Sequence, residues 1–163
     1  KAAIDAKPNA GHIALVKLEE KFEVTIITQN VDHLHELAGS SKIIHLHGEL
    51  FKSRSTVDER LVYDIKGWEL KLGDKCEKGS QLRPHIVWFG EPVPMLDKAI
   101  KIVEEADILV IIGTSMKVYP AASLINFIKF ETPIYFIDAN FITTGKEIQI
   151  FDSDYHSLPI KNS

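Results

Sequence analysis

The sequence has 163 residues, a length that fits about one domain. Apolar residues make up 45% of the chain and charged residues 26%, which excludes a wholly disordered protein. The net charge of −4 gives no basis for direct binding of nucleic acid or of an anionic membrane. No apolar run approaches the roughly 20 residues that cross a bilayer, and residues 1–10 lack the apolar segment of a signal peptide.

The first part of the chain predicts alternating helices and strands. Asn9 can cap a first helix whose apolar positions form one broad stripe. The apolar residues of 23–28 predict a short strand. A second helix is expected to begin near Asn30 and to end at Gly39, a typical C-terminal glycine. Residues 43–47 predict the next strand.

Residues 52–82 differ from the rest, because charge is dense and apolar residues are scattered. We expect them to form a small inserted module within a main domain of residues 1–51 and 83–163. A disordered insertion is the alternative. If the module is folded, five large side chains are expected to pack it together: Leu61, Tyr63, Trp68, Leu70 and Leu72.

The second part of the chain continues the alternation. Residues 83–91 have a strand-like composition, and residues 95–106 predict an amphipathic helix. Residues 107–112 are mostly apolar, which suits a strand covered on both faces. A helix over 120–130 and a strand over 133–137 follow. The whole pattern predicts an α/β fold with a Rossmann-like parallel sheet flanked by helices.

Polar side chains follow three of the predicted strands, at the edge where ligands bind in parallel α/β sheets. They are Gln29, Asn30 and Asp32, then Gly113, Thr114 and Ser115, and finally Asp138, which Ala139 and Asn140 follow. Glycine backbone, hydroxyl groups and a carboxylate can hold ribose or phosphate. The same residue types also form turns and helix caps, so spacing alone leaves both interpretations open.

Two histidine pairs suggest further chemistry. His45 and His47 are two apart on a predicted strand and would share a face, whereas His33 and His35 on a helix would not. With a carboxylate such as Asp32, the strand pair could ligate a metal. His47, beside a glycine, could equally be a general base, or the pair could be structural. No Gly-x-Gly-x-x-Gly phosphate loop occurs in the chain.

Four segments decide between these interpretations when they are taken together. They are residues 28–35 with 38–40, residues 46–48, residues 83–91, and residues 113–115 with 118–122. In this order they resemble the sirtuin family of NAD-dependent protein deacylases, over a stretch from Pro8 to about Asn140. Phe51-Lys52 and residues 83–91 are most similar to the bacterial and mitochondrial branch.

The resemblance implies an NAD-dependent protein lysine deacylase that releases nicotinamide and O-acyl-ADP-ribose. It implies that His47 is the general base, a role that suits imidazole near neutral pH. The pocket for nicotinamide and its ribose would contain Gln29, Asn30 and Asp32, with Asn30 and Asp32 counted as catalytic. The adenosine half would be held by Gly113, Thr114, Ser115 and Asp138. An acyl-lysine protein or peptide would lie along Phe89, Gly90, Glu91, Val118 and Tyr119 by strand addition.

Three features depart from the family pattern. The small module of the family normally holds zinc with two Cys-x-x-Cys pairs, but the corresponding positions here are Ser55, Asp58, Cys76 and Gly79. We therefore expect neither a structural zinc nor any other metal. The Gly-rich segment that binds pyrophosphate is missing, so we expect the C-terminal part of a sirtuin that binds NAD poorly by itself. Asp138 stands where many relatives have asparagine.

Two alternatives to the enzyme remain at this point. One is a noncatalytic nucleotide-binding module with the same sheet, which would need neither His47 nor the 89–91 segment. The other is a degenerate sirtuin that acts as an interaction protein, which the lost zinc ligands favour and the intact 29–32 segment opposes. The single free cysteine indicates a cytoplasmic location. The acyl group and the oligomeric state stay open.

Overall fold

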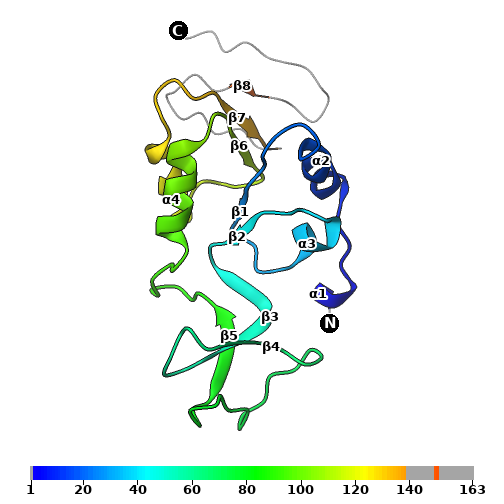
Figure 1. Cartoon of the computed structure of the whole chain (residues 1–163), viewed down its shortest axis with the longest axis vertical. Helices are drawn as coiled ribbons and strands as arrows, with labels where there is room; N and C mark the ends of the chain where they lie inside the picture. Colours follow the sequence, from blue (N-terminus) through cyan, green and yellow to red (C-terminus); the bar gives the residue numbers. More distant parts are fainter. Residues whose placement is uncertain (1, 139–148, 151–163) are drawn as a thin grey trace. The chain divides into compact units, whose positions relative to one another are not determined.

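The computed structural model describes residues 2–138 and 149–150 (Figure 1). The chain divides into two compact units, Lys1–Met95 and Leu96–Ser163. Both units contain helices and parallel strand pairs, which confirms the predicted α/β class. Within the described ranges, no helix is both long and apolar enough to cross a bilayer. Ala139, Asn140 and the tail beyond residue 150 lie outside the described residues.

The helices of the first unit are short and are set by local capping. After α1 (Ala2–Asp5), α2 (Ala10–Leu18) begins with a capping box. The Asn9 side chain accepts from the His12 amide at 3.1 Å, and the His12 ring accepts from the Asn9 amide at 3.3 Å. This confirms the predicted cap. The prediction that the next helix starts near Asn30 is wrong.

The third helix, α3 (Leu34–Ala38), starts later because the residues before it form a turn. Asp32 Oδ1 accepts a hydrogen bond from the Leu34 amide at 3.0 Å, which occupies one of the free donors at the start of this helix. The helix ends as predicted at Gly39, whose φ of 104° is left-handed.

Two parallel strands, β1 (Ile26–Thr28) and β2 (Ile43–His45), form the small sheet of the first unit. Ile26 in β1 and Ile44 in β2 are buried. The predicted strand 43–47 is too long, because the parallel pairing ends with the bond from the Leu46 amide to the Thr28 carbonyl at 2.9 Å, and Leu46 and His47 form a turn. The expectation that His45 and His47 share a strand face is therefore wrong.

A three-stranded antiparallel sheet completes the first unit, with the order β4-β3-β5 (Figure 1). Its strands are β3 (Gly48–Ser55), β4 (Val62–Asp64) and β5 (Leu82–Ile86). The region predicted as an insertion is thus ordered as part of a sheet that starts already at Gly48. The prediction that Trp68 and Leu72 help to pack this module together is wrong, because these residues are 58% and 97% exposed.

The second unit contains α4 (Leu96–Glu105), the 3-10 helix η1 (Ala121–Phe127), and three parallel strands. The strands are β6 (Leu109–Ile112), β7 (Ile134–Ile137) and β8 (Gln149–Ile150). Ala99, Val103, Ile111 and Phe136 are buried in its core. Val110 and Ile112 are 41% and 46% exposed, so the prediction that this strand is buried on both faces is wrong. The side chains alternate, and the described elements cover one face.

Candidate functional site

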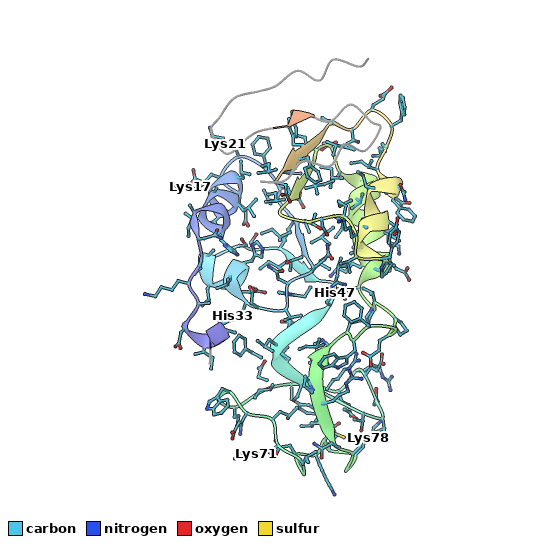
Figure 2. The ribbon with its side chains drawn as sticks, turned by 180° about the vertical axis from the view of Figure 1, so that it is seen from behind. Lys17, Lys21, His33, His47, Lys71 and Lys78 are labelled. Carbon is cyan, nitrogen blue, oxygen red and sulfur yellow. The ribbon has the colours of Figure 1, made fainter. Side chains whose placement is uncertain are left out.

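The parallel pairing of β1 and β2 brings two predicted site segments to one edge. Gln29 follows β1 and His47 lies between β2 and β3 (Figure 2). His47 Nδ1 lies 3.2 Å from the carbonyl oxygen of Gln29. A carbonyl oxygen can only accept, so this contact fixes the hydrogen on Nδ1 and leaves Nε2 of the neutral ring as a proton acceptor. The arrangement suits a general base.

His45 lies at the same edge of the sheet, where two polar contacts hold its ring. Its Nδ1 lies 3.1 Å from the Asn30 carbonyl oxygen and its Nε2 lies 2.7 Å from Glu36 Oε1. The side chain is 8% exposed. Across the described residues, His45, His47 and Asp32 form no metal-ligand group, whereas donor atoms of Glu36, His45 and Glu49 lie within 4.8 Å of one another. Sequence reasoning missed Glu36, although the His-x-His spacing pointed to its partner.

Asn30 and Asp32 lie in the turn between β1 and α3. The Asn30 amide donates to Thr28 Oγ1 at 3.1 Å, and its exposed side chain does not cap α3. The interpretation of Asn30 as a helix cap is therefore wrong. Its side-chain amide, unlike its backbone amide, remains available to a ligand at this edge. Asp32 and Gln29 are half-buried beside it.

The segment after β5 presents an exposed ring next to an anchored carboxylate. Phe89 is fully exposed and Gly90 has a φ of 87°. Glu91 binds Arg83, accepts from the Trp88 amide at 3.0 Å, and lies 3.2 Å from Arg54 Nη2. The hydrogen bond from Arg83, followed by that from the Trp88 amide, lowers the pKa of Glu91 to about 2. Its carboxylate thus fixes the segment.

In the second unit, the ends of β6 and β7 also meet at one edge. Gly113 follows β6 and Asp138 follows β7, and the Gly113 amide donates to the Ile137 carbonyl at 2.9 Å. Gly113 has a φ of 59°, which favours glycine. Thr114 Oγ1 accepts from the Met116 amide at 3.3 Å. Of the remaining predicted residues of this unit, Ser115, Val118 and Tyr119 are all exposed.

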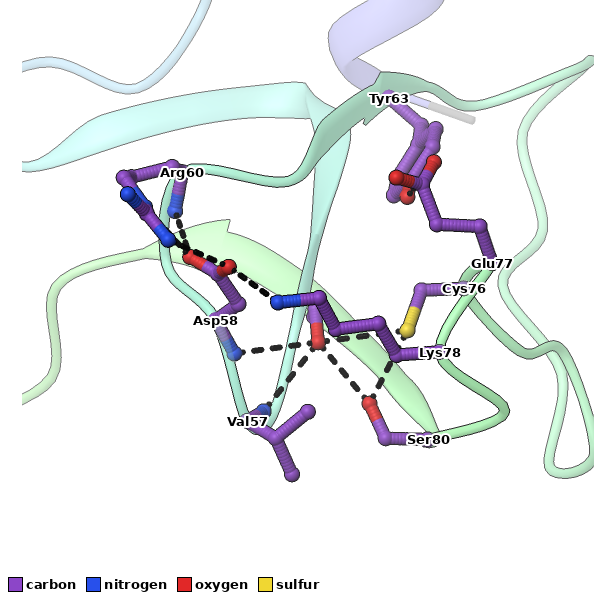
Figure 3. A network of polar contacts seen from close by, with 9 residues as sticks. Val57, Asp58, Arg60, Tyr63, Cys76, Glu77, Lys78 and Ser80 are labelled. Atoms are coloured by element: carbon purple, nitrogen blue, oxygen red, sulfur yellow. Dashed lines mark hydrogen bonds and ion pairs between the residues drawn. The ribbon is translucent and has the colours of Figure 1, made fainter.

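Three of the four positions that correspond to zinc ligands, Ser55, Asp58 and Cys76, lie in a network of polar contacts (Figure 3). Ser55 is 1% exposed, and its Oγ accepts from the amides of Val57 and Asp58 at 3.2 and 3.3 Å. The Cys76 thiol donates to the same oxygen at 3.4 Å, and Ser80 Oγ lies 2.9 Å from it. These bonds from Ser55 and Ser80 lower the pKa of Cys76 to about 7.

The carboxylate of Asp58 is also committed within this network. It forms ion pairs with Arg60 at 3.0 Å and with Lys78 at 2.8 Å (Figure 3). Hydrogen bonds from Arg60 first, and then from Lys78, hold the pKa of Asp58 far below its ordinary range. Gly79 supplies no side chain. Serine, a paired carboxylate and one thiol do not make the tetrahedral thiolate site that structural zinc takes, so the residues present do not fit this metal.

Comparisons with known proteins agree with these motifs. The family model described as "Sir2 family" matches residues 1–120. The chain belongs to the Sir2 family. This confirms the resemblance to sirtuins, and with it the Rossmann-like fold. The chain is 51% identical over 149 residues to an "NAD-dependent protein deacylase" of Bacteroides thetaiotaomicron, covering 88% of this chain and 64% of the relative.

Other Sir2 relatives extend the comparison. A protein of Helicobacter pylori with the same name is 57% identical over 133 residues, covering 80% of this chain and 57% of its own length. A solved Sir2 homologue in complex with NAD is 42% identical with a TM-score of 0.76, over 85% of this chain and 56% of that one. A Sir2 protein bound to acetylated peptide is 33% identical with a TM-score of 0.71, over 85% of this chain and 62% of that one. The chain therefore spans about 57% to 64% of the first curated relatives.

Proposed function

We propose that the protein to which this chain belongs is an NAD-dependent protein lysine deacylase with His47 as its general base. Membership of the Sir2 family and the names of its relatives support the activity. The observation that carries the assignment of the base is the contact of 3.2 Å between His47 Nδ1 and the Gln29 carbonyl. It leaves Nε2 to accept a proton, which a noncatalytic nucleotide-binding module would not need.

Two groups of residues, one at a sheet edge of each unit, carry the chemistry that binding of NAD needs. When bound, it supplies the ribose carbon whose bond to nicotinamide breaks as the acyl-lysine oxygen is joined to it. Gln29, Asn30 and Asp32 would hold the nicotinamide half, since amide and carboxylate groups gather after β1. Gly113, Thr114, Ser115 and Asp138 would hold the adenosine half, since β6 and β7 end beside one another. His47 would accept the proton of a ribose hydroxyl at Nε2 as that oxygen bonds to the acyl carbon. With the addition of water, the bond between the acyl carbon and the lysine nitrogen would break, so that deacylated lysine, nicotinamide and O-acyl-ADP-ribose would be released.

The substrate would be an acyl-lysine protein or peptide. The Sir2 structure bound to acetylated peptide supports this proposal. Phe89, Gly90, Val118 and Tyr119 are exposed, and their side chains offer apolar surface beside which a peptide could add as a strand. Glu91 would contribute indirectly, because its carboxylate is bound to Arg83 and fixes the strand end.

The remaining parts of the proposal concern organisation and location. Residues 1–51 and 83–163 would form the NAD-binding domain, and residues 52–82 a zinc-free form of the family's small module. The unpaired Cys76 supports a cytoplasmic location. The acidic net charge of −4 supports a partner other than nucleic acid.

The test is an NAD-consumption assay on the full-length protein with acetyl- and succinyl-lysine peptides. We expect nicotinamide release that depends on the peptide, and His47→Ala should lower kcat by at least about 100-fold, as is typical when a general base is lost. His12→Gln is the matched control, because glutamine keeps the capping box of α2. Full activity of His47→Ala would exclude the proposed base, and no NAD consumption by the wild type would exclude the enzyme.

A further inference from the structure

His45 contacts the turn that orients the proposed base, yet the proposed reaction gives it no role. Its two ring nitrogens face two oxygen atoms, the Asn30 carbonyl at 3.1 Å and Glu36 Oε1 at 2.7 Å. The ring is almost fully enclosed, with 8% of its side chain exposed. A buried imidazole with two polar contacts is a fixed part of the structure.

The contacts form a continuous path from α3 to His47. Glu36 in α3 binds the His45 ring in β2, and that ring holds the carbonyl of Asn30. The preceding carbonyl, that of Gln29, receives Nδ1 of His47. The Gln29 carbonyl shares its planar peptide unit with the Asn30 amide, which donates to Thr28 Oγ1 at 3.1 Å, whereas the Asn30 carbonyl belongs to the next unit. The two units meet at the Asn30 Cα, so a rotation of Asn30 after loss of the His45 contact would change the direction of the acceptor that orients the base.

We propose that His45, held by Glu36, is a positioning residue: its contact with the Asn30 carbonyl fixes the backbone at Asn30, next to the Gln29 carbonyl, and so keeps Nε2 of His47 free to accept a proton. This inference rests on the proposed function, because it gives His47 the role of base. His45 itself touches no reacting atom. Of the histidines His45 and His47, the resemblance to sirtuins gave a chemical role to His47 alone.

Each of the two contacts of His45 requires a hydrogen atom between the ring nitrogen and the oxygen. The Asn30 carbonyl accepts only, so Nδ1 must carry a hydrogen. The Glu36 contact at 2.7 Å needs a second hydrogen, on His45 Nε2 or on the Glu36 carboxyl. Glu49 in β3 lies close to the same pair, because the possible metal-ligand atoms of Glu36, His45 and Glu49 are all within 4.8 Å of one another.

Two substitutions separate the contacts, because each keeps one hydrogen-bond donor. In His45→Asn the amide nitrogen lies as many bonds from Cα as Nδ1 does, so it can still donate to Asn30. In His45→Gln the amide nitrogen corresponds to Nε2 and can donate only to Glu36. His45→Ala removes both donors, and His12→Gln in α2 is a control for the loss of an imidazole elsewhere.

The experiment has two readouts on the full-length protein. Nitrogen-15 NMR of the His47 ring should show Nδ1 protonated in the wild type and in His45→Asn, and a mixture of tautomers in His45→Ala and His45→Gln. Nicotinamide release should fall about 10-fold in kcat for His45→Ala and His45→Gln, with the KM for peptide nearly unchanged, since displaced catalytic groups cost about this much or more. His45→Asn should restore most of kcat.

An unchanged His47 tautomer in His45→Ala would overturn the inference, and so would equal kcat values for the asparagine and glutamine variants. The NMR readout needs no turnover. A wild-type protein without activity would therefore contradict the proposed function, while the tautomers would still decide whether His45 positions His47.

Discussion

Ser55 Oγ at the end of β3 lies 2.9 Å from Ser80 Oγ in the turn before β5, across 25 residues of sequence. This contact joins the two loops that carry the positions of the family's zinc ligands. Ser55 also accepts from the amides of Val57 and Asp58, so one buried hydroxyl satisfies two backbone donors (Figure 3). The module is thus joined by hydrogen bonds at the positions where the resemblance to sirtuins implies two Cys-x-x-Cys pairs.

Ser55→Ala tests this role, because it removes the buried acceptor of two backbone amides. We expect a loss of about 2 kcal/mol in the free energy of unfolding, since each lost hydrogen bond costs about 1 kcal/mol. Ser80→Ala is the matched control, since it removes one hydroxyl and leaves both amides bound to Ser55; it should cost below about 1 kcal/mol. Urea denaturation measures both values. Equal losses would contradict the central role of Ser55.

Rebuilding the ligand set should create a metal site. Ser55→Cys, Asp58→Cys and Gly79→Cys together with Cys76 would restore two Cys-x-x-Cys pairs. We expect the triple variant to purify with about one zinc per chain by elemental analysis and to lose stability with a chelator, as structural zinc sites do. The natural protein should retain no stoichiometric zinc and show a Tm that chelator leaves unchanged. Bound zinc in the natural protein would contradict the interpretation.

Acid should weaken the anchor of the segment that follows β5. Arg83 and the Trp88 amide lower the pKa of Glu91 from its ordinary value of 4.5 to about 2. Between these values the unfolded chain binds more protons at this position than the folded one, so stability falls as the pH falls. We expect Tm to decrease from pH 5 toward about pH 2 more steeply in the wild type than in Glu91→Gln. Thermal unfolding across this range, with Glu104→Gln as the control, measures it; equal slopes would show that Glu91 does not contribute.

Local signals in the sequence predicted the elements well. The Asn9 cap and the Gly39 ending depend on neighbours within a few residues, and both are present. The parallel alternation also placed Gln29 and Asp138 at strand ends, since a strand's direction follows from its connections. Elements set by nearby residues can be predicted from nearby residues.

Contacts between distant residues were not predictable in the same way. Arg54 and Glu91 lie 37 positions apart, and nothing in their local spacing indicates that they bind. The strand over 43–47 was predicted too long because its end is decided elsewhere, by the Thr28 carbonyl and by the Val87 amide that donates to His47. The exposed Trp68 was expected in a core because composition records how apolar a residue is but not where its side chain lies.

Gly48 shows how such a distant contact constrains the residue beside the proposed base. Its φ is 85°, and a Cβ placed on it would lie 2.0 Å from the His85 carbonyl oxygen on the neighbouring strand. Gly48→Ala must therefore push β3 away from β5 and move His47. Gly79→Ala is a matched control, because Gly79 has a similar φ of 75° with no atom within 4 Å of its Cβ position.

We expect Gly48→Ala to cost about 3 kcal/mol in unfolding free energy, from backbone strain and overpacking together. Gly79→Ala should cost about 1 kcal/mol, from strain alone. Urea denaturation of the two variants gives the difference, and the full-length Gly48→Ala protein should also lose NAD consumption, since the ring that precedes it is displaced from the Gln29 carbonyl. Equal costs for the two variants would mean that β3 yields easily, and the close approach to His85 would then not be what holds His47 in place.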